Sequence, residues 1–147
     1  EDMLASASVE KEASFWAQIG KHQSDAEATA VARLMTAWRH LGGDFLFGDG
    51  QETSCFVLCR TQERQPWPFT IYPSGRIEVV FQHMANRPPF DAIELRTEFH
   101  TRLSQVPGLA LDERLEARPG FDLGLLTDSA AFDGVVEAMA WFIDTAS

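Results

Sequence analysis

Two nearly identical pentapeptides, "RPPFD" at Arg87–Asp91 and "RPGFD" at Arg118–Asp122, contain the side chain best suited to binding an anion. A guanidinium pairs with a carboxylate or a phosphate through two parallel hydrogen bonds. If the fold brings Arg87 and Arg118 together, they can converge on one anionic group. In the alternative interpretation, each Arg-Pro favours extended backbone, each Phe anchors a connection in the core, and each Asp caps or turns the chain. The residues after the two copies share no pattern, which excludes a duplicated module.

A tryptophan in "RQPWPF" is the second feature that indicates binding. Trp67 lies between two prolines, so we expect an extended loop at a sheet edge. Tryptophan is enriched among the residues that contribute most to protein interfaces. We therefore predict a contact surface built from five side chains, Arg64, Trp67, Arg76, Arg87 and Arg118.

Metal-dependent chemistry has weaker support. Asp49 and Glu78 are the nearest candidates for a nuclease-type metal site, with His83 as a third ligand. That chemistry also uses a lysine, and no lysine occurs beyond position 21. Glu94 and Glu98 lie one helical turn apart and could hold a divalent ion with His83, but acidic helix surfaces are routine in an acidic chain. We predict no metal and no cofactor.

Other motifs that carry chemistry are missing from the sequence. The glycine-rich segment "GGDFLFGDG" has neither the glycine spacing nor the lysine of a phosphate-binding loop. No Gly-x-Ser-x-Gly elbow occurs, and the histidines lack the paired spacing of a zinc site. Cys55 and Cys59 share one face of a predicted strand roughly 13 Å apart, too far to form a disulfide. We expect both thiols to be buried in a reducing compartment.

Segments with helical periodicity are predicted both before and after the central part of the chain. Residues 8–20 are predicted to form a first helix, and the "SDAE" capping box at Ser24 begins a second one, which Gly42 ends. Asp91, with Glu94 three residues later, is predicted to cap a third helix that stops at Pro107. A last helix begins near Asp128 and closes the chain.

The middle of the chain alternates with a period of two residues. Four strands are expected, at 45–47, 54–60, 69–72 and 76–82, joined by Gly-Asp-Gly and Pro-Ser-Gly turns. The predicted fold class is α+β: a four-stranded antiparallel meander with two N-terminal and two C-terminal helices packed mainly on one face. Residues 1–7 are predicted to be disordered, and 8–147 to form a single domain.

Composition limits the partners. The chain has 147 residues and a net charge of −10, which argues against strong nucleic-acid binding. No apolar run is long enough to span a membrane, so we expect no membrane contact and a cytoplasmic location.

The stretch from Gly75 to Leu126 resembles an uncharacterised bacterial domain. In that pattern a strand precedes a Pro-Pro-Phe-Asp element, a helix containing Arg-Leu follows, and an Arg-Pro-x-Phe element comes before the final helix. Members occur as accessory segments of larger proteins, some of them nuclease-like. The resemblance implies that the two pentapeptides mark the fold, and it transfers no catalytic residue.

Together these observations favour a non-catalytic binding or accessory module. It would engage a protein partner or form a homodimer, through the wet face of the sheet or through an edge strand. A small metal-dependent hydrolase or nuclease-like enzyme using Asp49, Glu78 and His83 is the alternative. An acidic chaperone-like protein is a third hypothesis.

Overall fold

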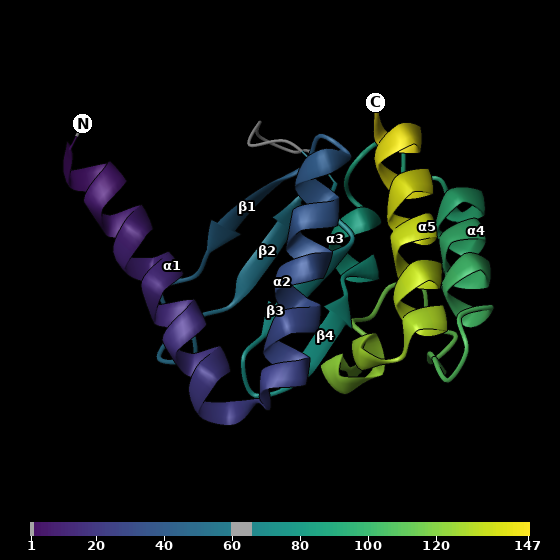
Figure 1. The fold of residues 1–147 in the computed structure, drawn as a ribbon. Helices are drawn as coiled ribbons and strands as arrows, with labels where there is room; N and C mark the ends of the chain where they lie inside the picture. Colours follow the sequence, from purple (N-terminus) through teal and green to yellow (C-terminus); the bar gives the residue numbers. More distant parts are fainter. Residues whose placement is uncertain (1, 60–65) are drawn as a thin grey trace.

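The computed structural model describes residues 2–59 and 66–147 and has an α+β fold (Figure 1). The helices and strands follow in the order α1 (Asp2–His22), α2 (Asp25–His40), β1 (Asp44–Phe47), β2 (Cys55–Leu58), β3 (Phe69–Tyr72), β4 (Arg76–Val79), α3 (Phe81–Met84), α4 (Ile93–Ser104), β5 (Gly120–Asp122), the 3₁₀ helix η1 (Leu123–Thr127) and α5 (Ser129–Ala146). The predicted α+β class is confirmed, and the described residues form one strand, one short α-helix and one 3₁₀ helix more than expected. None of the helices in these ranges is long and apolar enough to cross a bilayer.

The sheet has five strands in the order β1-β2-β3-β4-β5, and all neighbours are antiparallel. The prediction of four strands was therefore wrong, because β5 pairs with β4 and aligns Phe121 with Ile77. This strand lies inside the second pentapeptide. It has three residues and begins with glycine after proline, so the sequence offers no alternating pattern by which to recognise it.

The last predicted strand also ends earlier than expected, at Val79 instead of Gln82. The amide of Val80 still donates to the Pro68 carbonyl at 3.1 Å, and the chain then turns into α3. Gln82 donates its amide to the Ala117 carbonyl at 3.0 Å, so this short helix is held against the segment that leads into β5. The turn places His83 beside the end of the sheet.

Two of the predicted helix caps are confirmed and one was wrong. Ser24 and Glu27 form the reciprocal capping box of α2, and Asp128 accepts the Ala131 amide at 2.9 Å. At α4 the N-cap is Ala92, which has no side chain to accept a hydrogen bond. Asp91 is exposed and does not cap this helix, and the start of the helix is instead held by a side chain of α4 itself.

The buried side chain of Arg96 holds the chain at the start of α4. Arg96 is only 5% exposed, and its Nη1 donates to the carbonyls of Phe90 and Asp91 at 3.0 and 3.2 Å. The guanidinium thus holds the connection that contains the first pentapeptide against α4.

The first helix begins at Asp2, earlier than the expected start at Ser8. Its C-terminal half fastens the connection between β1 and β2, because Gln18 accepts the Thr53 amide at 2.9 Å and donates to the Gln51 carbonyl at 3.0 Å. The disorder of residues 1–7 stays a prediction, which amide exchange would test.

The two faces of the sheet differ in burial. Helices α1, α2 and α5 lie on one face (Figure 1), and the strand residues that point toward them are at most 9% exposed. Cys55 belongs to this buried set, and burial raises the pKa of its thiol. Cys59, which follows β2, is also buried. The opposite face, here called the open face, carries partly or largely exposed side chains: Leu46, Phe56, Leu58, Tyr72, Arg76 and Glu78.

Candidate functional site

An aromatic stack covers one end of the open face. The indole of Trp67, just before β3, and the imidazole of His83, in α3, have centroids 4.8 Å apart and planes inclined by 24°. The indole also meets the Phe56 ring edge-on at 6.2 Å. It covers Thr70, which is 2% exposed, and its Nε1 lies 3.5 Å from the Thr70 hydroxyl. Trp67 is therefore half-buried on the sheet and does not project from it.

Arg87 contacts both residues of this stack, through the ring of Trp67 and the backbone carbonyl of His83. Its guanidinium carbon lies 4.9 Å from the centroid of the Trp67 ring, within the range of a cation–π contact. Its Nη1 donates to the His83 carbonyl at 3.2 Å. The Nε atom of Arg87 is buried and donates to no atom in the described part of the chain. Arg87 thus links the loop of the first pentapeptide to the Trp67 ring and to the backbone of His83.

Arg118, from the second pentapeptide, holds the same histidine by its ring. It donates from Nη2 to His83 Nε2, and from Nε to Gln82 Oε1 at 2.9 Å. A guanidinium only donates, so Nε2 of His83 must accept, which assigns the neutral imidazole with its proton on Nδ1. Burial, and then the charges of Arg118 and Arg87, lower the pKa of His83. Burial and the two neighbouring arginines thus favour the neutral form of this histidine.

A carboxylate connects this group to the middle of the sheet. Arg76 Nε lies 3.4 Å from Glu78 Oε2, and Arg118 Nη1 lies 3.8 Å from Oε1 of the same side chain. The Tyr72 hydroxyl donates to Oε1 at 3.3 Å, and burial, followed by the charge of Glu78, raises the pKa of this phenol. Arg76 also donates from Nη2 to the Arg118 carbonyl at 3.2 Å. We call the whole group the arginine–aromatic cluster: Trp67, Tyr72, Arg76, Glu78, Gln82, His83, Arg87 and Arg118.

A glycine in the second pentapeptide makes room for this arrangement. A Cβ atom added at Gly120 would lie 2.5 Å from Arg76 Cζ and 2.8 Å from its Nε. The guanidinium therefore lies flat across β5, where any side chain would displace it. This contact explains why the second copy has glycine where the first has proline.

Four of the five predicted contact residues, Trp67, Arg76, Arg87 and Arg118, are thus brought into one connected group. The fifth, Arg64, lies outside the described residues. The structure supports the buried phenylalanine anchors of the structural interpretation of the repeated pentapeptide. Their phenylalanines are buried, at 0% and 9% exposure, and their arginines meet on His83. The convergence of the two arginines on one anion stays a prediction.

Sequence reasoning missed the part that His83, Gln82 and Tyr72 play in this cluster. His83 was considered only as a metal ligand, because the strand was expected to continue to Gln82. A helical turn at residues 81–84 carries the imidazole back over Trp67. No pattern in the sequence predicts that a four-residue helix forms here.

The candidate metal ligands are not gathered into a site. Asp49 lies in the connection between β1 and β2 and pairs with Lys11 of α1 at 2.5 Å. Glu78 contacts Tyr72 and arginines, and Glu98 pairs with Arg102 at 2.8 Å. In the part of the chain that the structure describes, no three His, Cys, Asp or Glu side chains are placed to hold a metal ion.

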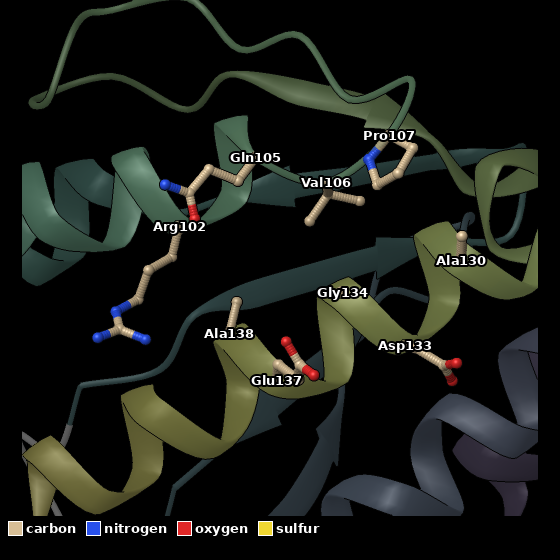
Figure 2. Close-up of a pocket in the computed structure, with 9 residues that line it drawn as sticks. All are labelled: Arg102, Gln105, Val106, Pro107, Ala130, Asp133, Gly134, Glu137 and Ala138. Carbon is tan, nitrogen blue, oxygen red and sulfur yellow. The ribbon is translucent and has the colours of Figure 1, made fainter.

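A shallow groove of about 280 Å³ lies between α4 and α5 (Figure 2). On α5 it is floored by Ala130, Gly134 and Ala138, and a Cβ atom at Gly134 would lie 3.1 Å from Val106. The charged side chains at its rim have opposite signs, and Arg102 is already paired with Glu98. The groove is accounted for by small residues that let the two helices approach.

Comparison of this chain with protein-family models, curated proteins and solved structures found no match. The function of the candidate site must therefore be inferred from its geometry alone.

Proposed function

We propose that this chain is a non-catalytic binding module that docks a protein partner on the open face of its sheet. The observation that carries the proposal is the composition of that face. Half-buried Phe56 and Leu58, and Leu46 at 51% exposure, lie beside a connected cationic cluster. Apolar contact area next to arginine and tryptophan is typical of the residues that dominate protein interfaces.

The contacts of His83 favour binding over catalysis. A general base must reach the proton of a nucleophile through a free ring nitrogen. In the described part of the chain, Nε2 of His83 accepts from Arg118, and the ring face is stacked on Trp67. Neither contact is with a hydroxyl or thiol that the imidazole could activate. The imidazole instead joins two arginines to an aromatic platform.

Charge favours a different protein over a second copy of this chain. Each copy carries a net charge of −10, so two copies repel one another at long range. The arginine–aromatic cluster contributes three arginines against one glutamate, and His83 is neutral. A cationic patch on an acidic protein attracts an acidic surface of a partner.

Site-specific photo-crosslinking tests the proposal. A photoreactive amino acid is placed at Leu46 on the open face, or at exposed Thr36 on α2 as a matched control. We expect a discrete heavier product from position 46 in cells of the source organism, and none from position 36. A product of twice the mass of the chain would identify self-association. Equal products from both positions, or no product from either, would contradict the proposal.

A further inference from the structure

Two arginines of the cluster share a single carboxylate. Arg76 lies 3.4 Å and Arg118 lies 3.8 Å from the oxygens of Glu78, which is 18% exposed. Only the shorter of these distances is within hydrogen-bonding range. Since two guanidinium groups face one carboxylate, one positive charge remains without a counter-ion inside the group.

Both arginines also keep donors that no hydrogen bond engages within the described residues. Arg76 is engaged through Nε and Nη2, and Arg118 through Nε and Nη2. Within the described residues, the Nη1 atoms of both side chains donate no hydrogen bond. The side chains are 52% and 39% exposed. An acceptor arriving from outside could bind these Nη1 groups without displacing a hydrogen bond, and at Arg118 it would compete only with the 3.8 Å contact between Nη1 and Glu78 Oε1.

The nearest acidic residue of the neighbouring strand does not fill this position. Asp122 is the Cα partner of Arg76 across β4 and β5. Its carboxylate instead accepts the Gly124 amide at 2.7 Å and caps η1. Among the described residues, Glu78 is thus the carboxylate that pairs with Arg76 and Arg118.

We propose that Arg76 and Arg118 bind a carboxylate of the partner, an Asp or Glu side chain in an extended segment that also carries apolar residues. This inference rests on the proposed function and names what the open face recognises. Phe56 of β2 lies two strands away from Glu78, in the same row through Thr70. Strands are spaced about 4.8 Å apart, so an apolar side chain within about three residues of the carboxylate reaches this ring.

The charge of the pair favours a carboxylate over a phosphate. After Glu78 is counted, Arg76 and Arg118 together leave one positive charge, which one carboxylate neutralises. A phosphate monoester brings a charge of roughly −1.5 to −2 at neutral pH. Arg87 does not supply the difference, because its guanidinium is stacked on Trp67 and donates to the His83 carbonyl.

Nuclear magnetic resonance titration tests this inference. The signals followed are the Nε–H groups of Arg76 and Arg118 and the indole N–H of Trp67. The titrants are an acetylated and amidated peptide Gly-Glu-Ser-Leu-Leu-Gly, the same peptide with glutamine in place of glutamate, and inorganic phosphate. We expect the glutamate peptide to shift all three signals and to bind about tenfold more tightly than the glutamine peptide, since hydrogen bonds between two charged groups are stronger than those to a neutral acceptor.

Variants distinguish a specific site from general attraction. Arg76→Gln changes an exposed side chain and should reduce the affinity for the glutamate peptide to that of the glutamine peptide. Arg114→Gln, which changes an exposed arginine paired with Asp112, should leave that affinity unchanged. Equal loss in both variants would overturn the inference.

The remaining outcomes separate this inference from the proposed function. Equal affinity of the two peptides, with shifts confined to the open face, would overturn carboxylate recognition and leave docking on that face intact. Phosphate binding as tight as that of the glutamate peptide would show a general anion site and also overturn the inference. No shift with any titrant would overturn it too, while crosslinking from position 46 would still decide the proposed function.

Discussion

The indole of Trp67 and the imidazole of His83 lie stacked, with centroids 4.8 Å apart, and an arginine of each repeated pentapeptide holds the histidine. Arg87 binds the backbone carbonyl, and Arg118 binds the ring. Segments separated in sequence by some thirty residues are thereby fixed against one aromatic platform. A binding surface whose side chains are already held in place loses less entropy when a partner binds.

The stability of the protein should depend on pH through His83. The pKa of this histidine is lowered below its usual value of 6.5 in the folded state, so the unfolded chain takes up a proton first as the pH falls. The contribution of neutral His83 to stability is therefore complete above pH 6.5 or so, and is lost as the pH falls below it. Thermal melting midpoints measured from about pH 7.5 to about pH 5.5 should decrease in the natural chain.

In the His83→Asn variant this part of the decrease should disappear. The exposed His22 provides the control, and His22→Asn should keep the slope of the natural chain. An identical slope in both variants would show that protonation of His83 is not coupled to folding.

Arg96 should be the most sensitive charged residue of α4. Arg96→Met keeps an apolar stem but leaves the carbonyls of Phe90 and Asp91 without their donor, so we expect a loss of about 2–4 kcal/mol in the free energy of unfolding. The same replacement at Arg102, an exposed residue paired with Glu98 on the same helix, should cost less than about 1 kcal/mol. Urea denaturation of both variants measures the difference, and similar losses would refute a special role for Arg96.

Two exposed glycines should respond in opposite directions to alanine. An added Cβ meets no atom within 4 Å at Gly20 or at Gly42. Gly20 lies in the helical backbone of α1, so Gly20→Ala should stabilise the protein by up to about 1 kcal/mol. Gly42 has a φ of +99°, so Gly42→Ala should destabilise it by about 1–2 kcal/mol. Calorimetry gives both values, and a shift of the same sign in both variants would contradict this assignment.

Gly120→Ala should weaken binding of the glutamate peptide while it changes the stability of the protein little. The atoms nearest to the added methyl group belong to the guanidinium of Arg76, the flexible end of an exposed side chain, so the loss of stability should stay below about 1 kcal/mol. Displacement of that guanidinium from Glu78 should weaken binding of the glutamate peptide severalfold. Unchanged peptide affinity, with altered Arg76 signals in the spectrum, would show that Arg76 does not contribute to recognition.

The sequence predicts this fold where its signals are local. The capping box at Ser24, the alternation in β4 and the turn containing Gly75 each depend on a few adjacent residues. The fifth strand and α3 depend on contacts made elsewhere in the chain. Residues 120–122 form a strand only because β4 offers a free edge, and residues 81–84 turn because Ala117 supplies an acceptor for Gln82.

The candidate site was predictable to a similar extent. Side-chain chemistry alone singled out Trp67, Arg76, Arg87 and Arg118, because tryptophan and arginine have few equivalents at interfaces. Their connection through His83 and Glu78 was not predictable, since it depends on where the strand β4 ends. The capping prediction at Asp91 was wrong because a buried arginine one turn into the helix holds the chain instead.

The measurement that tests the central claim most directly is the crosslinking yield from position 46 when the cluster is altered. The photoreactive residue is combined with Arg76→Gln and Arg118→Gln in one chain, and with Arg114→Gln in another. If the arginine–aromatic cluster recognises the partner, the specific product should fall severalfold in the first chain and persist in the second, while melting midpoints confirm that both are folded. An undiminished product from the folded double variant would contradict the account.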